Sequence, residues 1–192
     1  YPTPAMSAIT GYPVIADRTI REEEYYWIWQ GRTGLSLYHP ASEQISFASD
    51  FPNDTGKYHI IKCIEKCRTQ PGIWAASGNA CVVHLQHESM KMKCIQEIRI
   101  PDACQVRVLH EDDQGNLWIG TENAIYQYSI SDGNMRRIHK DTGAINGIAI
   151  SPDKAIYYIT ETPEFSCLPP DGQVHSIHKG ENYSSIIISP DN

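Results

Sequence analysis

The sequence lacks both an excess of positive charge and any long apolar run. It contains 16 Lys and Arg against 23 Asp and Glu, a formal net charge of −7, and so has no basic surface of the kind that binds nucleic acid or anionic membranes. No run approaches the roughly 18 to 20 apolar residues that cross a bilayer. The chain opens at Tyr1 without a Met or a signal segment, so we expect its start to have been trimmed. We expect this segment to contact neither nucleic acid nor membrane.

Cysteine is too scarce for a disulfide-built scaffold, with six residues in 192. There is no CxxC pair, and Cys63 and Cys67 would share one face of a strand, too far apart to bond each other. The pattern therefore favours neither a zinc site nor a disulfide framework, and the disulfide state stays open. We expect buried or half-buried free thiols at Cys63, Cys67, Cys81, Cys94, Cys104 and Cys167.

The motifs of the common catalytic sites are also missing. The sequence has no Gly-x-Ser-x-Gly elbow, no glycine-rich phosphate loop and no His-Glu-x-x-His. Acidic runs at 22–24 and 111–113 fall in expected turns, where solvated charge is a sufficient explanation. We therefore expect no catalytic residue, no cofactor and no enzymatic activity in this segment.

What the sequence does contain is a repeat. Residues 106–140 alternate as four short strands separated by the turn signals "DQGN" and "SDG". The segment "DGNMRRIHK" (132–140) returns as "DGQVHSIHK" (171–179), 39 residues later. Upstream, "GIWAASGNACVVHL" (72–85) and "WIWQGRTGLSLYH" (27–39) fit the same frame. The chain is therefore built from copies of one unit.

Each copy has an aromatic anchor in its second strand. We assign the anchors to Trp29, Trp74, Trp118 and Tyr157, which are 45, 44 and 39 residues apart. Each Trp is followed two positions later by a small residue, such as Gly31. One cause explains all four aromatics, namely packing between adjacent units, so we do not treat them as ligand contacts.

A four-stranded antiparallel unit repeated every 40 to 45 residues or so is typical of β-propeller blades. The sequence thus predicts an all-β propeller in a single segment spanning 1–192. A β-sandwich, the alternative, predicts no such self-similarity. The expected blades lie near 20–49, 59–100, 106–140 and 145–179.

The end of the chain begins another repeat, because "IIISPDN" echoes "IAISPDK". We expect a first strand at 184–189 without its sequels, and hence a fragment of a larger propeller. Alternatively, this strand displaces the N-terminal one and closes a four-bladed ring.

The stretch "EDDQGNLWIGTENAIYQYS" resembles the two-component regulator propeller repeat, with its acidic pair, Gly-Asn-Leu-Trp-Ile-Gly-Thr core and aromatic-rich strand. Such repeats typically form the sensing region of hybrid histidine kinases, outside the cytoplasmic membrane, where they detect carbohydrate breakdown products. The resemblance implies a non-catalytic, periplasmic or otherwise extracytoplasmic sensor module. Its expected partners are an oligosaccharide or other small ligand and a second propeller or protomer, and a histidine kinase is expected elsewhere in the full-length protein.

A second stretch, "AINGIAISPDKAIYYITET", is similar to gluconolactonase and senescence-marker lactonase propellers. That resemblance implies a metal-dependent lactonase with Asn146 as a ligand and Glu161 where the family has Asp. The Thr-Glu pair at 160–161 repeats the pair at 121–122, which argues against Glu161 as a unique ligand. A third alternative is a purely protein-binding propeller.

Residues that break the repeat are the candidates for ligand contact, because loops on a rigid scaffold concentrate function. The irregular segments are 49–59 and 162–172, and aromatic residues outside the anchor position are candidates for stacking on a sugar. The expected ligand-binding residues are Tyr26, Trp27, Arg32, His84, His87 and Phe165.

Overall fold

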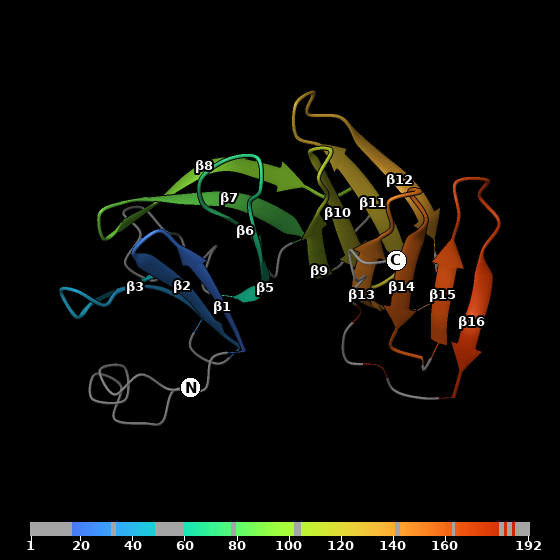
Figure 1. Cartoon of the computed structure of the whole chain (residues 1–192), viewed down its shortest axis with the longest axis horizontal. Coiled ribbons are helices and arrows are strands. Elements are labelled where there is room, and N and C mark those ends of the chain that lie inside the picture. The colour runs from blue at the N-terminus through green and yellow to red at the C-terminus, as the bar shows by residue number, and fades with distance from the viewer. Residues whose placement is uncertain are drawn as a thin grey trace. The chain divides into compact units, whose positions relative to one another are not determined.

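The computed structural model describes residues 17–31, 34–48, 60–77, 80–101, 105–140, 143–162 and 164–180, together with Tyr183 and Ile186. Within these ranges the chain forms sixteen β-strands in four sheets (Figure 1). Each sheet has four antiparallel strands in sequence order, so each is a simple meander. The expected all-β fold made of four-stranded antiparallel blades is confirmed.

The four sheets, here called blades 1 to 4, fall on the four repeats. Blade 1 comprises β1 (Arg18–Glu22), β2 (Tyr25–Gln30), β3 (Gly34–His39) and β4 (Gln44–Phe47). Blade 2 comprises β5 (Ile61–Lys66), β6 (Ile73–Ser77), β7 (Cys81–Glu88) and β8 (Lys91–Arg99). Blade 3 comprises β9 (Val106–Glu111), β10 (Asn116–Thr121), β11 (Ala124–Ser129) and β12 (Met135–Lys140). Blade 4 comprises β13 (Ile145–Ile150), β14 (Ile156–Thr160), β15 (Glu164–Leu168) and β16 (His175–Lys179).

The chain divides into two compact units, one ending at Arg99 and the other beginning at Ile100. Blades 1 and 2 make up the first unit, and blades 3 and 4 the second. The expected strand at 184–189 lies outside the described residues apart from Ile186. A single body over 1–192, a larger propeller and a closed four-bladed ring therefore stay predictions.

Each unit is held together by apolar side chains that meet between its two blades. In the first unit Trp27 and Leu37 of blade 1 pack in one cluster with Ile64 and Ile73 of blade 2. Because one sheet cannot bury both faces alone, the second blade supplies the missing cover. Full burial of each such side chain contributes about 1.5–3 kcal/mol relative to exposure.

The second unit follows the same rule. Trp118 of blade 3 shares a cluster with Ile145, Ile148 and Tyr158 of blade 4. Of the four expected anchors, Trp118 thus packs against the blade that follows in the sequence, as expected.

The expected anchor of blade 1 is wrong by two residues, because Trp27 and not Trp29 occupies the anchor position. Trp27 pairs with Leu37, ten residues on, as Trp74 pairs with His84. Trp29 pairs with Leu35, only six residues on. Both tryptophans lie on the same strand face, and "Trp29-x-Gly31" imitates the Trp-x-small pattern of the other blades.

Trp29 instead forms a hydrogen bond to blade 2. It is half-buried, and its Nε1 donates a hydrogen bond of 2.9 Å to the carbonyl of Ile61 at the start of blade 2. The turn between β1 and β2 contains only Glu23 and Glu24, with Glu23 at φ 54°. This tight turn moves Trp27 into the anchor position.

A β-bulge recurs at one position in three blades. The pairing of the first with the second strand shifts register at Lys62 in blade 2, at Arg107 in blade 3 and at Asn146 in blade 4. Each of these is the second residue of its blade's first strand. Because a bulge leaves its extra residue unpaired and re-aims the side chain, all three polar residues are set apart from the ladder around them.

The five described cysteines are free thiols. Four of them are buried or half-buried as expected, but Cys94 is exposed on β8. Cys104 lies outside the described residues. In the part of the chain that the structure describes, no helix has the length and apolar character that a membrane span requires.

Candidate functional site

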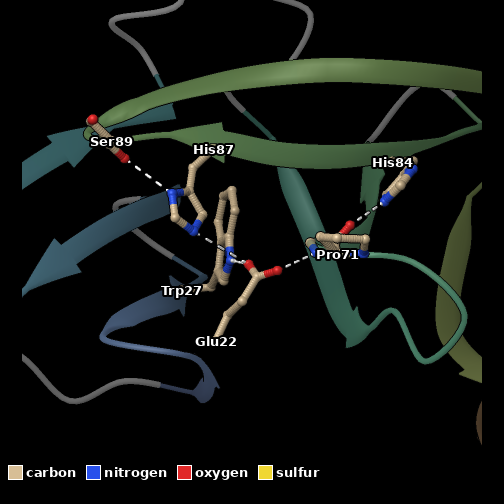
Figure 2. A network of polar contacts seen from close by, with 7 residues as sticks. Glu22, Trp27, Pro71, His84, His87 and Ser89 are labelled. Atoms are coloured by element: carbon tan, nitrogen blue, oxygen red, sulfur yellow. Dashed lines mark hydrogen bonds and ion pairs between the residues drawn. The ribbon is translucent and has the colours of Figure 1, made fainter.

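Polar residues of neighbouring blades come together in both units. In the first unit, one such place is centred on Glu22, at the end of β1 (Figure 2). Its carboxylate accepts a hydrogen bond of 2.7 Å from Trp27 Nε1 and another from the backbone N–H of Gly72. His87 Nε2 lies 3.7 Å from the same carboxylate. Glu22 therefore joins the edge of blade 1 to two segments of blade 2.

Aromatic rings pack around this carboxylate. The Tyr25 ring stacks on His39 at 4.7 Å between centroids and lies 4.1 Å from the His87 ring. The His87 ring is also 5.8 Å from Trp27, edge-on. The side chains of Glu22 and His87 are only 14% and 13% exposed. These rings thus cover one another.

His84 belongs to the core of blade 2. It is 1% exposed, its Nε2 lies 2.8 Å from the carbonyl oxygen of Pro71, and its ring is 4.9 Å from Trp74. It therefore fixes the turn before β6 (Figure 2). Ordered packing accounts for this histidine without a ligand.

Of the remaining expected ligand contacts, Trp27 belongs to this network, whereas Tyr26 and Phe165 do not. Trp27 is fully buried, so its ring is not open for stacking on a sugar. Tyr26 is half-buried in a separate cluster of blade 1 with Ile28, and its ring lies 5.9 Å from the guanidinium carbon of Arg21. Phe165 is half-buried on β15. Arg32 lies outside the described residues.

The second place is a pocket of about 380 Å³ in the second unit. It lies where β10 ends in blade 3 and β14 ends in blade 4. Its lining is about equally polar and apolar and includes charged residues of both signs. The lining residues are Arg107, Glu122, Gly143, Ala144, Glu161 and Thr162.

The repeat itself places the two glutamates. The backbone N–H of Glu122 donates to the carbonyl of Gln105 at 3.2 Å, and that of Glu161 to the carbonyl of Ala144 at 2.8 Å. Each glutamate therefore extends its second strand at the same point, beside the start of its own first strand. The two carboxylates reach one pocket because adjacent blades repeat the same geometry.

The two bulges supply the opposite charge and fix it. Arg107 donates a hydrogen bond of 2.8 Å from its guanidinium to Asn146 Oδ1, so the bulged residues of blades 3 and 4 touch each other. A guanidinium held by a neighbour is pre-organised to bind a carbonyl, hydroxyl or carboxylate oxygen.

This contact bears on the lactonase interpretation. The Asn146 oxygen that would serve a metal already accepts the Arg107 hydrogen bond, and the guanidinium brings positive charge to the site. Among the described residues no group of three or more His, Cys, Asp or Glu is arranged to hold a metal ion. The geometry therefore gives the metal-dependent alternative at Asn146 and Glu161 no support.

The acidic turns are structural and not simply solvated. Asp112 accepts hydrogen bonds from Trp118 Nε1 at 2.8 Å and from the backbone N–H groups of Gln114 and Asn116, both at 2.9 Å. Burial alone would raise the pKa of Asp112, but these bonds outweigh it and lower the pKa below its ordinary value. Asp112 thus closes its own turn, whereas the longer Glu22 reaches from its turn to the next blade.

Sequence reasoning missed Arg107 and Glu122 as pocket residues. A signal exists for the first, because Lys62, Arg107 and Asn146 put a polar residue at the second position of the first strand in three blades. The repeated Thr-Glu pair, which argues against Glu161 as a unique ligand, gives no hint of this pocket. The structure places both glutamates in its lining.

Comparison with known proteins places one of these repeats in a family. Residues 100–123 match the two component regulator propeller model, so the resemblance of this repeat is confirmed. Both Arg107 and Glu122 lie within the match. A comparison with curated protein sequences found no match.

Solved propellers resemble the chain over most of its length. Two crystal structures of the extracellular domain of BT4673 from B. thetaiotaomicron each align with a TM-score of 0.68 and 18% identity, over 91% of this chain and 24% of that one. BT4673 is described in one as a one component system and in the other as a hybrid two component system. This chain thus spans about a quarter of those domains.

A third neighbour is the WD40 β-propeller domain of Doa1. It aligns with a TM-score of 0.60 and 11% identity, over 84% of this chain and 53% of that one. At such identities these likenesses establish the fold alone, and the fold is that of propeller blades.

Proposed function

We propose that this chain is the ligand-binding part of a non-catalytic propeller sensor in two-component signalling. The observation that carries the proposal is the pocket between blades 3 and 4, because two of its charged residues, Arg107 and Glu122, lie inside the repeat that matches the regulator family. Binding residues supported on rigid strands are typical of such modules.

The family match of one repeat and the structural neighbours support a location for this chain. The extracellular description of BT4673 supports an extracytoplasmic, periplasmic location for this chain. We further propose that a histidine kinase in the rest of the protein receives the signal. Membrane fractionation of the full-length protein, with protease protection of this region, tests the location, and cleavage from the cytoplasmic side only would contradict it.

The proposed mechanism uses the two-blade construction of the pocket. Arg107 belongs to blade 3 and Glu161 to blade 4, so a ligand that contacts both favours one packing of the two blades. A ligand shifts such an equilibrium only by its difference in affinity for the two arrangements. That difference is the signal passed to the kinase.

An oligosaccharide is the first ligand to test. Sugar hydroxyls can donate to the Glu122 and Glu161 carboxylates and accept from Arg107. Calorimetric titration of a broad oligosaccharide panel should reveal binding. Arg107→Ala should weaken binding by about tenfold or more, as expected for loss of a charged hydrogen bond. The matched control is Arg136→Ala, which removes an exposed guanidinium bonded to Gln127.

Two results would contradict this assignment. Failure of the whole panel would favour a purely protein-binding propeller. Equal affinities of Arg107→Ala and Arg136→Ala would move the ligand away from the pocket, toward the predicted contacts at Tyr26, His87 and Phe165.

We also propose that a second copy of this chain docks on the outer strand of blade 4. All five residues of β16 are exposed; Ile177 on this strand is 49% exposed, and Val174, directly before the strand, is 40% exposed. An exposed strand edge with apolar side chains favours pairing with another strand. Sedimentation should show self-association that Ile177→Lys abolishes, and an unchanged monomer fraction in that variant would refute the contact.

A further inference from the structure

The charge balance in the pocket between blades 3 and 4 points to one class of ligand. Its lining contains two carboxylates, Glu122 and Glu161, and one guanidinium, Arg107. The formal charge of the lining is therefore negative. A site of this composition attracts positive charge and repels anionic ligands such as phosphates or sugar acids.

The guanidinium does not pair with the carboxylates directly. The hydrogen bond described for Arg107 goes to Asn146 Oδ1 at 2.8 Å. Within the described ranges no cationic side chain forms an ion pair with Glu122 or Glu161. The two glutamates therefore line a pocket whose one cationic side chain is bonded to another residue.

Backbone hydrogen bonds hold both glutamates in place. The backbone N–H of each glutamate is bonded to the chain at the start of its own blade, through Gln105 for Glu122 and Ala144 for Glu161. Glu122 is half-buried, so its carboxylate is less able to turn away into water than a fully exposed one. A cation in the pocket is attracted by both carboxylates.

We propose that this pocket binds a small polar ligand through a primary ammonium group held by Glu122 and Glu161, while Arg107 binds an oxygen acceptor of the same ligand. An amino sugar and a free amino acid both present this chemistry. The inference rests on the proposed sensor function and narrows its ligand class from neutral oligosaccharides to amine-bearing molecules. No backbone rearrangement is required, because the bulge already separates Arg107 from the strand ladder.

The test compares ligands that differ only in the amine. The 192-residue chain is titrated calorimetrically with glucosamine, N-acetylglucosamine and glucose, and in a second arm with alanine and N-acetylalanine. We expect the free amine to bind about tenfold more tightly than its acetylated partner in one arm, and that arm identifies the source. Added salt should reduce the difference, because it screens partly exposed charges.

Variants locate the effect. Glu161→Gln should remove most of the preference for the free amine while thermal stability stays unchanged, because Glu161 is exposed and its side chain makes no described contact. Glu43→Gln, an equally exposed glutamate at a turn of blade 1, should retain the full preference. Loss of preference in both variants would refute the assignment to this pocket.

The outcomes separate this inference from the sensor proposal. Equal binding of free and acetylated amines overturns the ammonium site and leaves the sensor proposal intact. If these ligands and the oligosaccharide panel all fail to bind, both proposals are overturned.

Discussion

Removal of the Glu22 carboxylate should destabilise the first unit strongly, because two buried donors depend on it. Glu22→Ala leaves the indole N–H of Trp27, which is 0% exposed, and the N–H of buried Gly72 without acceptors. Each orphaned buried donor costs about 1–3 kcal/mol. Two such donors together would cost about 2–6 kcal/mol. Since Glu22 is itself 14% exposed and water can enter in part, we expect the lower half of this total, about 2–4 kcal/mol.

Such a loss is large against a typical stability of about 5–15 kcal/mol. In a chain of this size it corresponds to a fall in melting temperature of about 4–16 °C. Glu22→Gln retains the length and one acceptor oxygen but turns an amide N–H₂ toward the other donor, so about half the effect is expected.

The assay is thermal unfolding followed by tryptophan fluorescence, with urea titration as a second measure. Glu24→Ala is the matched control, because its side chain is 69% exposed and lies 3.6 Å from His39 Nε2. That control should change stability by no more than about 0.5 kcal/mol. Equal shifts for Glu22→Ala and Glu24→Ala would refute the view that Glu22 links the two blades.

Two further predictions concern the second unit. Gly120→Ala should lower the free energy of unfolding in urea by about 1–3 kcal/mol, because a Cβ there would lie 2.6 Å from Val108 Cγ1. Gly31→Ala is the control, because its Cβ would meet its first neighbour at 3.4 Å. Equal losses of stability in the two variants would contradict close blade packing. The lowered pKa of Asp112 means that its carboxylate stabilises the fold above about pH 4 and that this stability is lost as the pH falls through the folded-state pKa. The melting temperature of the wild type should therefore exceed that of Asp112→Asn at neutral pH, and the two should converge in acid. Asp113→Asn, the control, should follow the wild type. A difference in melting temperature between the wild type and Asp112→Asn that persists in acid would show that the charge is irrelevant.

The strands could be predicted closely from the sequence because alternation and turn residues are local signals. The runs read at "VRVLHED" and "MRRIHK" correspond to β9, Val106–Glu111, and β12, Met135–Lys140. Glycine and Asp at the turns made these limits visible. Repetition then supplied the fold, because one clear copy identified the weaker ones.

The repeat pattern predicted the wrong anchor where two tryptophans both fit the anchor position. "WIWQG" offers Trp27 and Trp29 on the same strand face, and sequence spacing alone favoured the one with glycine two positions later. The choice depended on the length of the turn at Glu23 and Glu24, which allows a positive φ at a non-glycine residue. The residue types of Glu23 and Glu24 do not predict that conformation.

The pocket was harder to predict because it arises from contacts between blades. The bond between Arg107 and Asn146 joins residues 39 apart, and each looks ordinary within its own strand. His84 shows the opposite error, since a histidine without a repeat equivalent proved to be a core residue. A departure from the repeat is therefore not by itself a sign of ligand contact.

The recurrent bulge separates the side-chain chemistry at the blade end from the pairing that holds the blade together, two requirements that usually constrain each other in a small sheet. Lys62, Arg107 and Asn146 differ in size and charge, yet the strands around them keep the same pairing and the same order. A substitution at this position changes the chemistry shown at the blade end without changing the residues that hold the blade together. The bulge position is therefore a natural place to diversify in a library, and a lineage of such chains can acquire new ligand preferences there while its fold is retained.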